Sequence, residues 1–204
     1  MRRRSVAWAA VAPVVAAPGP AWAHSFRSGA DGYQQFLEGA WVIVGYPGIL
    51  LPLVALGLLL GLWDREGMVR AWPALIVGLV LGVPLGAVAP VAVATGFVAF
   101  GVFVAALTAL LARHSRYEAF ALAGIAGAMA MATALEGHGL FQLPVMIHLG
   151  LFLTANLAVA ASAGLVRVST DHVPAQWMRI LWRIAASWIA AVLILYLAYL
   201  SRGA

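Results

Sequence analysis

Long apolar stretches separated by short polar breaks fill the chain from residue 40 to its C-terminus. An α-helix needs about 20 apolar residues to cross the hydrocarbon core of a bilayer, and it satisfies its own backbone hydrogen bonds there. The pattern predicts six such helices, at residues 40–63, 72–89, 91–112, 117–136, 143–166 and 180–200. The predicted fold class is therefore all-α: a polytopic membrane helical bundle of about six transmembrane helices over residues 40–204.

The N-terminus has the three-part pattern of a secretory signal peptide, so we expect residues 1–23 to be a cleavable signal. Arginines at 2–4 precede an apolar stretch at 6–17, and the Ala-Trp-Ala triplet ending at Ala23 supplies a cleavage pattern. Cleavage there leaves His24 as the mature N-terminus, followed by an exported segment at 24–39. The alternative is an uncleaved anchor helix.

The positions of the arginines predict the orientation of the helices. If the mature N-terminus is outside, seven arginines fall in or beside cytoplasmic breaks: Arg65, Arg70, Arg113, Arg116, Arg167, Arg179 and Arg183. Only Arg27 and Arg202 stay on the outer side. Cytoplasmic loops of membrane proteins carry an excess of basic residues. We therefore expect a bacterial inner (cytoplasmic) membrane protein whose mature N-terminus is periplasmic.

Small residues and short breaks predict how the helices pack. Small side chains recur on the second and fourth predicted helices, at Gly78, Gly82 and Gly86 and at Gly124, Gly127 and Ala128. Such surfaces let helix backbones approach closely within a membrane. The tight turn near Pro90 predicts a hairpin of the second and third helices, and the short break at 137–142 predicts that the fourth and fifth are neighbours.

Composition agrees with a lipid environment and narrows the function. Hydrophobic residues make up 64% of the chain and charged residues only 9%, whereas soluble domains carry about a quarter. The net charge of +5 comes from arginines in short clusters, not from the broad basic surface that nucleic acid requires. Cysteine is absent, which excludes a disulfide or a thiolate metal site. No catalytic motif is present, so we expect neither an enzyme nor a nucleic-acid partner.

Polar residues near the membrane are the default candidates for function. Six of them collect on the predicted outer side: Asp31 and the five candidate metal ligands His24, Glu38, Glu136, His138 and His148. Imidazole with carboxylate suits Ni, Co, Zn or Cu. Asn156 and Thr133 would continue a transport path inward. Alternatively, Glu136 and His138 simply face water, His148 is a core histidine bonded to a neighbouring helix, and Asn156 bridges two helices.

The order of these features resembles the hydrogenase and urease accessory membrane proteins (HupE/UreJ), often described as nickel or cobalt permeases. The resemblance rests on the signal ending before His24, the glycine-rich helix at 71–82, the ending Leu135-Glu136-Gly137-His138-Gly139, and the closing segment at 194–197. The stretch at 45–52 lacks the His and Asp of the family's first helix. Glu136 stands where the family's leading histidine would be, so only His138 matches that motif.

Two functions from different classes follow from this comparison. The first is a permease-like or accessory protein that handles a divalent transition metal, nickel first, for metalloenzyme maturation. It would bind no permanent cofactor, and its partners would be the bilayer, the metal ion and maturation proteins. The second is a non-transporting membrane scaffold or assembly subunit for a hydrogenase, a urease or a respiratory metalloenzyme.

Overall fold

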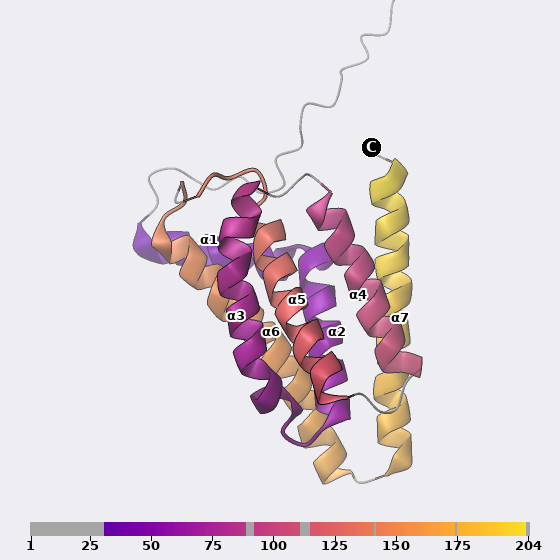
Figure 1. The fold of residues 1–204 in the computed structure, drawn as a ribbon. Helices are drawn as coiled ribbons and strands as arrows, with labels where there is room; N and C mark the ends of the chain where they lie inside the picture. Colours follow the sequence, from indigo (N-terminus) through magenta and orange to yellow (C-terminus); the bar gives the residue numbers. More distant parts are fainter. Residues whose placement is uncertain (1–30, 89–91, 111–114, 141, 174, 203–204) are drawn as a thin grey trace, which may run out of the picture.

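A computed structural model of the chain describes residues 31–88, 92–110, 115–140, 142–173 and 175–202. The predicted signal peptide, its cleavage at Ala23 and the proposed ligand His24 lie outside the described residues. Seven helices are present in the described part (Figure 1): α1 (Gly32–Gly45), α2 (Pro47–Trp63), α3 (Gly67–Val88), α4 (Val93–Leu110), α5 (Arg116–Ala134), α6 (Val145–His172) and α7 (Gln176–Arg202).

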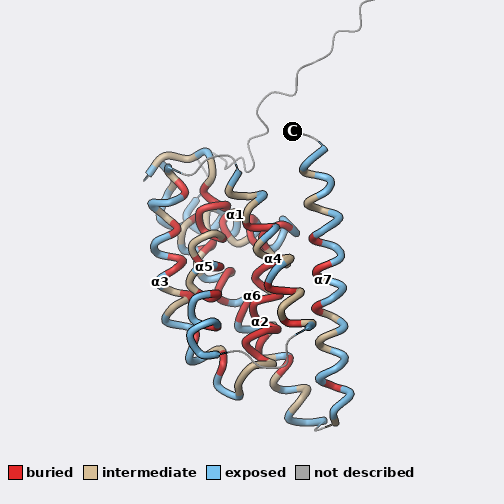
Figure 2. The backbone as a smooth tube through the Cα atoms, turned by 45° about the vertical axis from the view of Figure 1, so that its right-hand side comes forward, coloured by how far each residue is buried: buried red, intermediate tan, exposed pale blue. Residues whose placement is uncertain are grey.

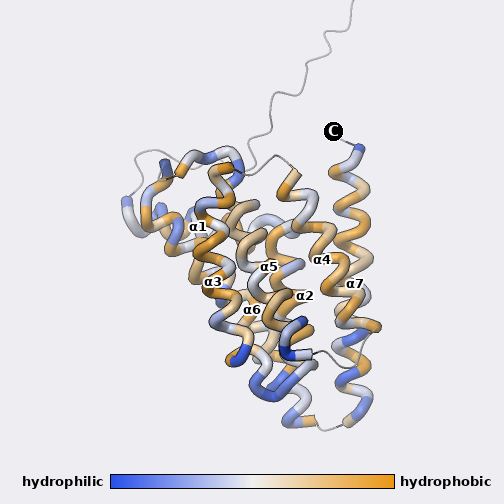
Figure 3. The backbone as a smooth tube through the Cα atoms, viewed as in Figure 1, coloured by the Kyte–Doolittle hydropathy of each residue, from blue (hydrophilic) through white to orange (hydrophobic). Residues whose placement is uncertain are grey.

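Five of these helices, α3 to α7, are long and apolar enough to cross a membrane. The α1–α2 pair would add a sixth span if its two helices together count as one. The predicted all-α class is therefore confirmed, as are helices suited to contact lipid. Apolar residues dominate the length of the bundle, whereas polar residues gather at its ends (Figure 3).

The first predicted helix, at 40–63, is wrong as a single straight element. Its place is taken by α1 and α2, which meet at a bend of 74°. Tyr46 between them is extended, with φ −111° and ψ 106°, because the ring of Pro47 disfavours helical backbone in the preceding residue. Pro47 itself fits the first position of α2, where its missing N–H costs nothing. The side chain of Asp31 caps α1 by accepting from the N–H of Gln34 at 2.8 Å.

The bundle has two ends, which we name after the connections found there. The α5–α6 end holds the loop at 135–144 and the C-terminus of α7, and α1 lies across it (Figure 1). The α6–α7 end holds the turn after His172 and the turn between α2 and α3. Glycines set the position of α1, because a Cβ on Gly39 or Gly150 would clash with the backbone of the partner helix.

Helix α2 is the centre of the bundle. It contacts every other helix, mainly α6 and α4, and Leu53, Leu56, Leu59 and Leu60 along it are fully buried. Buried residues are dense along α2 and recur along the neighbouring helices (Figure 2). Helix α2 has only 17 residues, and the surrounding protein stabilises its position by covering its apolar side chains.

Neither of the two predicted helix pairs is a main contact of the bundle. Instead of forming a hairpin with α4, α3 packs most extensively against α5, while α4 packs against α7 and α2. Likewise α6 packs mainly against α2 and α1, and its contact with α5 is minor. Short connections limit how far apart two helix ends can be, but complementary surfaces decide which helices lie side by side along their length.

The close approach expected of the glycine-rich surfaces is confirmed, and the two surfaces face each other. A Cβ on Gly78 would clash with the carbonyl oxygen of Gly124, and one on Gly82 would lie 2.5 Å from that of Ala128. From the other side, a Cβ on Gly127 would lie 2.5 Å from the carbonyl oxygen of Leu75. The α3–α5 seam, as we call this contact, therefore brings backbone against backbone and leaves no room for a Cβ at Gly78, Gly82 or Gly127.

Candidate functional site

Glu136 lies just beyond the end of α5, where it contacts the start of α4. Its carboxylate accepts a hydrogen bond from the backbone N–H of Ala94, in the first turn of α4. Its second oxygen, Oε2, is buried and has no hydrogen-bond partner within the described residues. Burial raises the pKa of Glu136, and the hydrogen bond from Ala94 opposes that rise in part. The group is thus a half-buried acid with one satisfied and one unsatisfied oxygen.

Thr133, one helical turn earlier, also has a buried side-chain oxygen that lacks a partner within the described residues. Its side chain is only 5% exposed, and its hydroxyl oxygen has no hydrogen-bond partner in the described part of the chain. Buried polar atoms are nearly always hydrogen-bonded in folded proteins, because an unpaired one costs roughly 1–3 kcal/mol. Two such atoms one turn apart, at the same end of α5, make this segment the candidate site.

His138 joins Glu136 through a local turn. Its Nδ1 lies 3.2 Å from the carbonyl oxygen of Glu136, and its backbone N–H donates to the carbonyl of Leu135 at 3.1 Å. Gly137 between them has a φ of 81°, in the left-handed region that favours glycine, so the turn depends on that residue. The predicted pair is therefore held together by sequence-local geometry.

His148 and Glu38 lie on different elements. His148, in the first turn of α6, has its Nδ1 3.1 Å from the carbonyl oxygen of Pro144, so the expected bond to a neighbouring helix is absent within the described residues. The ring lines a groove of about 430 Å³ between α3 and α6, with apolar neighbours such as Val83 and Phe152. Glu38 is half-buried on α1, beside the glycine that packs against α6.

The predicted convergence of metal ligands is not found. Within the described residues, no group of three or more His, Asp and Glu side chains is placed to hold a metal ion. Glu136 and His138 are together, whereas Glu38 and His148 do not complete a set with them. The separation follows from the packing, because α5 and α6 make only a minor contact and α1 lies across α6.

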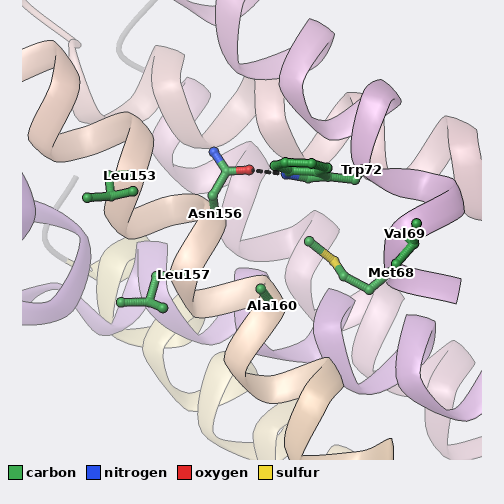
Figure 4. A pocket seen from close by; sticks show the side chains of 7 residues that line it. All are labelled: Met68, Val69, Trp72, Leu153, Asn156, Leu157 and Ala160. Atoms are coloured by element: carbon green, nitrogen blue, oxygen red, sulfur yellow. Dashed lines mark hydrogen bonds between the residues drawn. The ribbon is translucent and has the colours of Figure 1, made fainter. Parts of the chain in front are cut away.

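Asn156 bridges two helices, as the alternative interpretation predicted. Its Oδ1 accepts a hydrogen bond from Nε1 of Trp72 on α3 at 2.8 Å (Figure 4). Its Nδ2 donates to the carbonyl of Phe152 at 2.8 Å. Both ends of the amide are occupied, so it serves packing more than an ion path. Asn156 lies in a groove of about 330 Å³ between α3 and α6, which is otherwise lined by apolar side chains such as Met68 and Leu153. Sequence reasoning missed Trp72 as the partner because 84 residues separate the two.

Within six residues, the α5–α6 end therefore offers an imidazole together with a carboxylate and a hydroxyl that each have an oxygen without a hydrogen-bond partner among the described residues. No family model matches this chain, and comparisons with curated proteins and with solved structures find no match. The resemblance to the hydrogenase and urease accessory proteins stays a prediction.

Proposed function

We propose that the chain is an integral protein of the bacterial cytoplasmic membrane that handles a divalent transition metal ion, nickel first, for metalloenzyme maturation. One observation carries the proposal: the buried Oε2 of Glu136 and the buried hydroxyl of Thr133 both lack a partner within the described residues. A cation would supply what both oxygens lack, since it can be coordinated by several oxygen atoms at once. Ionisable groups at membrane depth or beside it are functional sites by default.

The surrounding groups favour a cation over an anion. Among the described residues, the α5–α6 end carries the carboxylates of Asp31, Glu38 and Glu136 and a single arginine, Arg202. A site with net negative charge attracts cations and raises their local concentration. The imidazole of His138 in the same turn adds a nitrogen donor, which favours nickel over magnesium or calcium. The resemblance to the nickel and cobalt permease family supports the same choice of metal.

The proposed orientation places the α5–α6 end outside. Six of the described arginines lie at the α6–α7 end, and an excess of arginine marks the cytoplasmic side. An ion would therefore meet Glu136 and His138 from the periplasm. The chain carries no nucleotide-binding motif, so transport would draw on an ion gradient or on a partner protein.

Uptake of radioactive nickel into proteoliposomes tests the proposal. We expect Glu136→Gln to lower the initial rate at least about tenfold, the factor that about 1.4 kcal/mol of lost ion stabilisation gives. Glu66→Gln is the matched control, because it removes an exposed carboxylate at the opposite end and should leave the rate within about twofold. An unchanged rate in a Glu136→Gln protein that inserts and folds normally would reject this site.

The second candidate function is a non-transporting scaffold or assembly subunit for a hydrogenase, a urease or a respiratory metalloenzyme. The lack of any three-ligand group in the described residues favours it, because a selective metal path is usually built from several converging ligands. The engaged amide of Asn156 favours it too, since this polar group of α6 is used for packing. Absence of nickel flux, together with stable co-purification of such an enzyme, would choose this function.

A further inference from the structure

A polar cavity of about 540 Å³ opens at the α6–α7 end, between the last turns of α6 and the start of α7. Its lining is charged or polar except for one alanine and consists of Arg167, Thr170, Asp171, Ala175, Gln176 and Arg179. The two grooves along α3 and α6, in contrast, are lined almost entirely by apolar side chains. The volume is that of a site for a small ligand or a headgroup.

Most arginines at this end of the bundle already have a partner. Arg70 pairs with Asp64 at 3.4 Å and with Glu66 at 3.2 Å. Arg116 lies over the ring of Tyr117, 4.8 Å from its centroid. These arginines therefore have structural explanations that require no ligand.

Arg183 is also occupied, although its partner is backbone. From α7 it donates to the carbonyl oxygens of Ala109 and Leu110 at 2.8 and 3.0 Å, which closes the C-terminal end of α4. A cation at this position also complements the negative end of the helix dipole. Arg183 therefore acts as a helix cap, and its position requires no ligand.

The two arginines of the cavity differ from these. Arg167 uses one nitrogen to bind Asp171 at 2.7 Å, while its Nε is buried and has no partner within the described residues. Arg179 makes no hydrogen bond and no ion pair with any described residue. All seven Asp and Glu of the chain lie in the described ranges, so no other carboxylate is available to pair with it. The cavity thus holds two guanidinium groups against one carboxylate.

We propose that this cavity binds a phosphate group. Guanidinium presents its N–H groups as a planar fork that matches two oxygens of a phosphate, and two arginines can hold one phosphate from two sides. Gln176, the first residue of α7, adds an amide side chain. The first-turn N–H groups of α7 are also at this end and favour a negative charge.

The position of the cavity favours a phospholipid headgroup as the source of that phosphate. With 28 residues, α6 is about 42 Å long at 1.5 Å per residue, against about 30 Å for the hydrocarbon core. Its last two turns, which carry Arg167 and Asp171, therefore reach the headgroup region. Trp177, which follows the lining residue Gln176 in the sequence, is 56% exposed, and tryptophan side chains anchor helices at that depth. A water-soluble phosphate ester is the other source of the same chemistry.

Asp171 should act as an internal competitor. Its carboxylate occupies one nitrogen of Arg167, so an incoming phosphate must displace it or share the guanidinium with it. Neutralising Asp171 leaves both arginines free for the ligand. The structure therefore predicts a loss of binding at Arg179 and a gain of binding at Asp171, two opposite effects from residues lining one cavity.

The test is native mass spectrometry of the detergent-solubilised full chain, titrated with phosphatidylglycerol, with phosphatidylcholine of the same acyl chains, or with inorganic phosphate. We expect Arg179→Gln to weaken phosphatidylglycerol binding about five- to tenfold and Asp171→Asn to strengthen it at least twofold, consistent with one charge-assisted hydrogen bond lost or gained. Arg65→Gln is the matched control, because Arg65 is exposed at the same end but outside the cavity. It should change binding less than twofold.

Displacement of phosphatidylglycerol by millimolar inorganic phosphate, with the same dependence on Arg179, would keep the site and make a soluble phosphate its natural ligand. Equal weakening by Arg65→Gln and Arg179→Gln would reduce the effect to the general charge of this end and overturn the proposal. Failure of both phosphatidylglycerol and phosphate to bind better than phosphatidylcholine would overturn it as well.

Discussion

The α3–α5 seam gives the sharpest prediction about stability, the replacement of Gly82 by alanine. The new Cβ would lie 2.5 Å from the carbonyl oxygen of Ala128, whereas ordinary contact begins at 3.4 Å, so the helices must separate by about 0.9 Å. A gap of 0.5–1 Å forfeits a quarter to a half of the dispersion energy of each contact along the seam. Overpacking of this kind costs about 1–3 kcal/mol, and we expect it to outweigh the gain of about 1 kcal/mol in helix propensity.

Gly164 on α6 is the matched control, because a Cβ there meets nothing within 4 Å. Gly164→Ala should keep the gain in helix propensity and stabilise the protein by up to about 1 kcal/mol. Reversible unfolding of both variants in mixed detergent micelles, followed by circular dichroism, measures the difference. If Gly82→Ala is as stable as Gly164→Ala, the backbone contact at the seam does not hold α3 against α5 and the reasoning is refuted.

Three further predictions use other contacts. Asn156→Leu and Trp72→Phe should each destabilise the protein by about 0.6–1.7 kcal/mol and should be non-additive in a double-mutant cycle, because they remove one shared hydrogen bond. Burial raises the pKa of Glu136 above its ordinary 4.5, so its protonated form adds stability that is present at acidic pH and lost as the pH rises through the raised pKa. A pH series of unfolding curves should show this loss for the native chain and not for Glu136→Gln. Arg183→Gln should lower stability by about 1–2 kcal/mol in thermal unfolding, whereas exposed Arg65→Gln should change it by less than about 0.5, since only Arg183 caps α4.

The candidate site was predictable only in part. The sequence placed Glu136 and His138 in one short segment, and they do lie together because a turn at Gly137 joins them. It could not place Glu38 and His148 relative to that pair, because they belong to helices whose neighbours are chosen by packing. The absence of a three-ligand group in the described residues is a consequence of that choice.

Two features of the sequence carry structural information that the hydropathy pattern does not include. The Tyr46-Pro47 step ends one helix and starts another, because proline restricts the residue before it. In the sequence, Arg167 and Arg179 indicate only the orientation of the helices. Their proximity depends on the turn between α6 and α7 and on side-chain pairing that no spacing rule provides.

By itself, the sequence determined that the chain forms long apolar helices suited to a bilayer, but not that the first of them is broken in two. Apolar stretches of about 20 residues must be helical if they are to satisfy their backbone in lipid, and five of the described helices meet that test. The tertiary structure alone decided that α3 lies on α5, that α1 bends away from α2, and that one oxygen each of Glu136 and Thr133 has no hydrogen-bond partner among the described residues. Those outcomes depend on which surfaces fit without a side chain between them, as Gly78 fits against Gly124. Such complementarity belongs to pairs of helices and cannot be determined from either one alone.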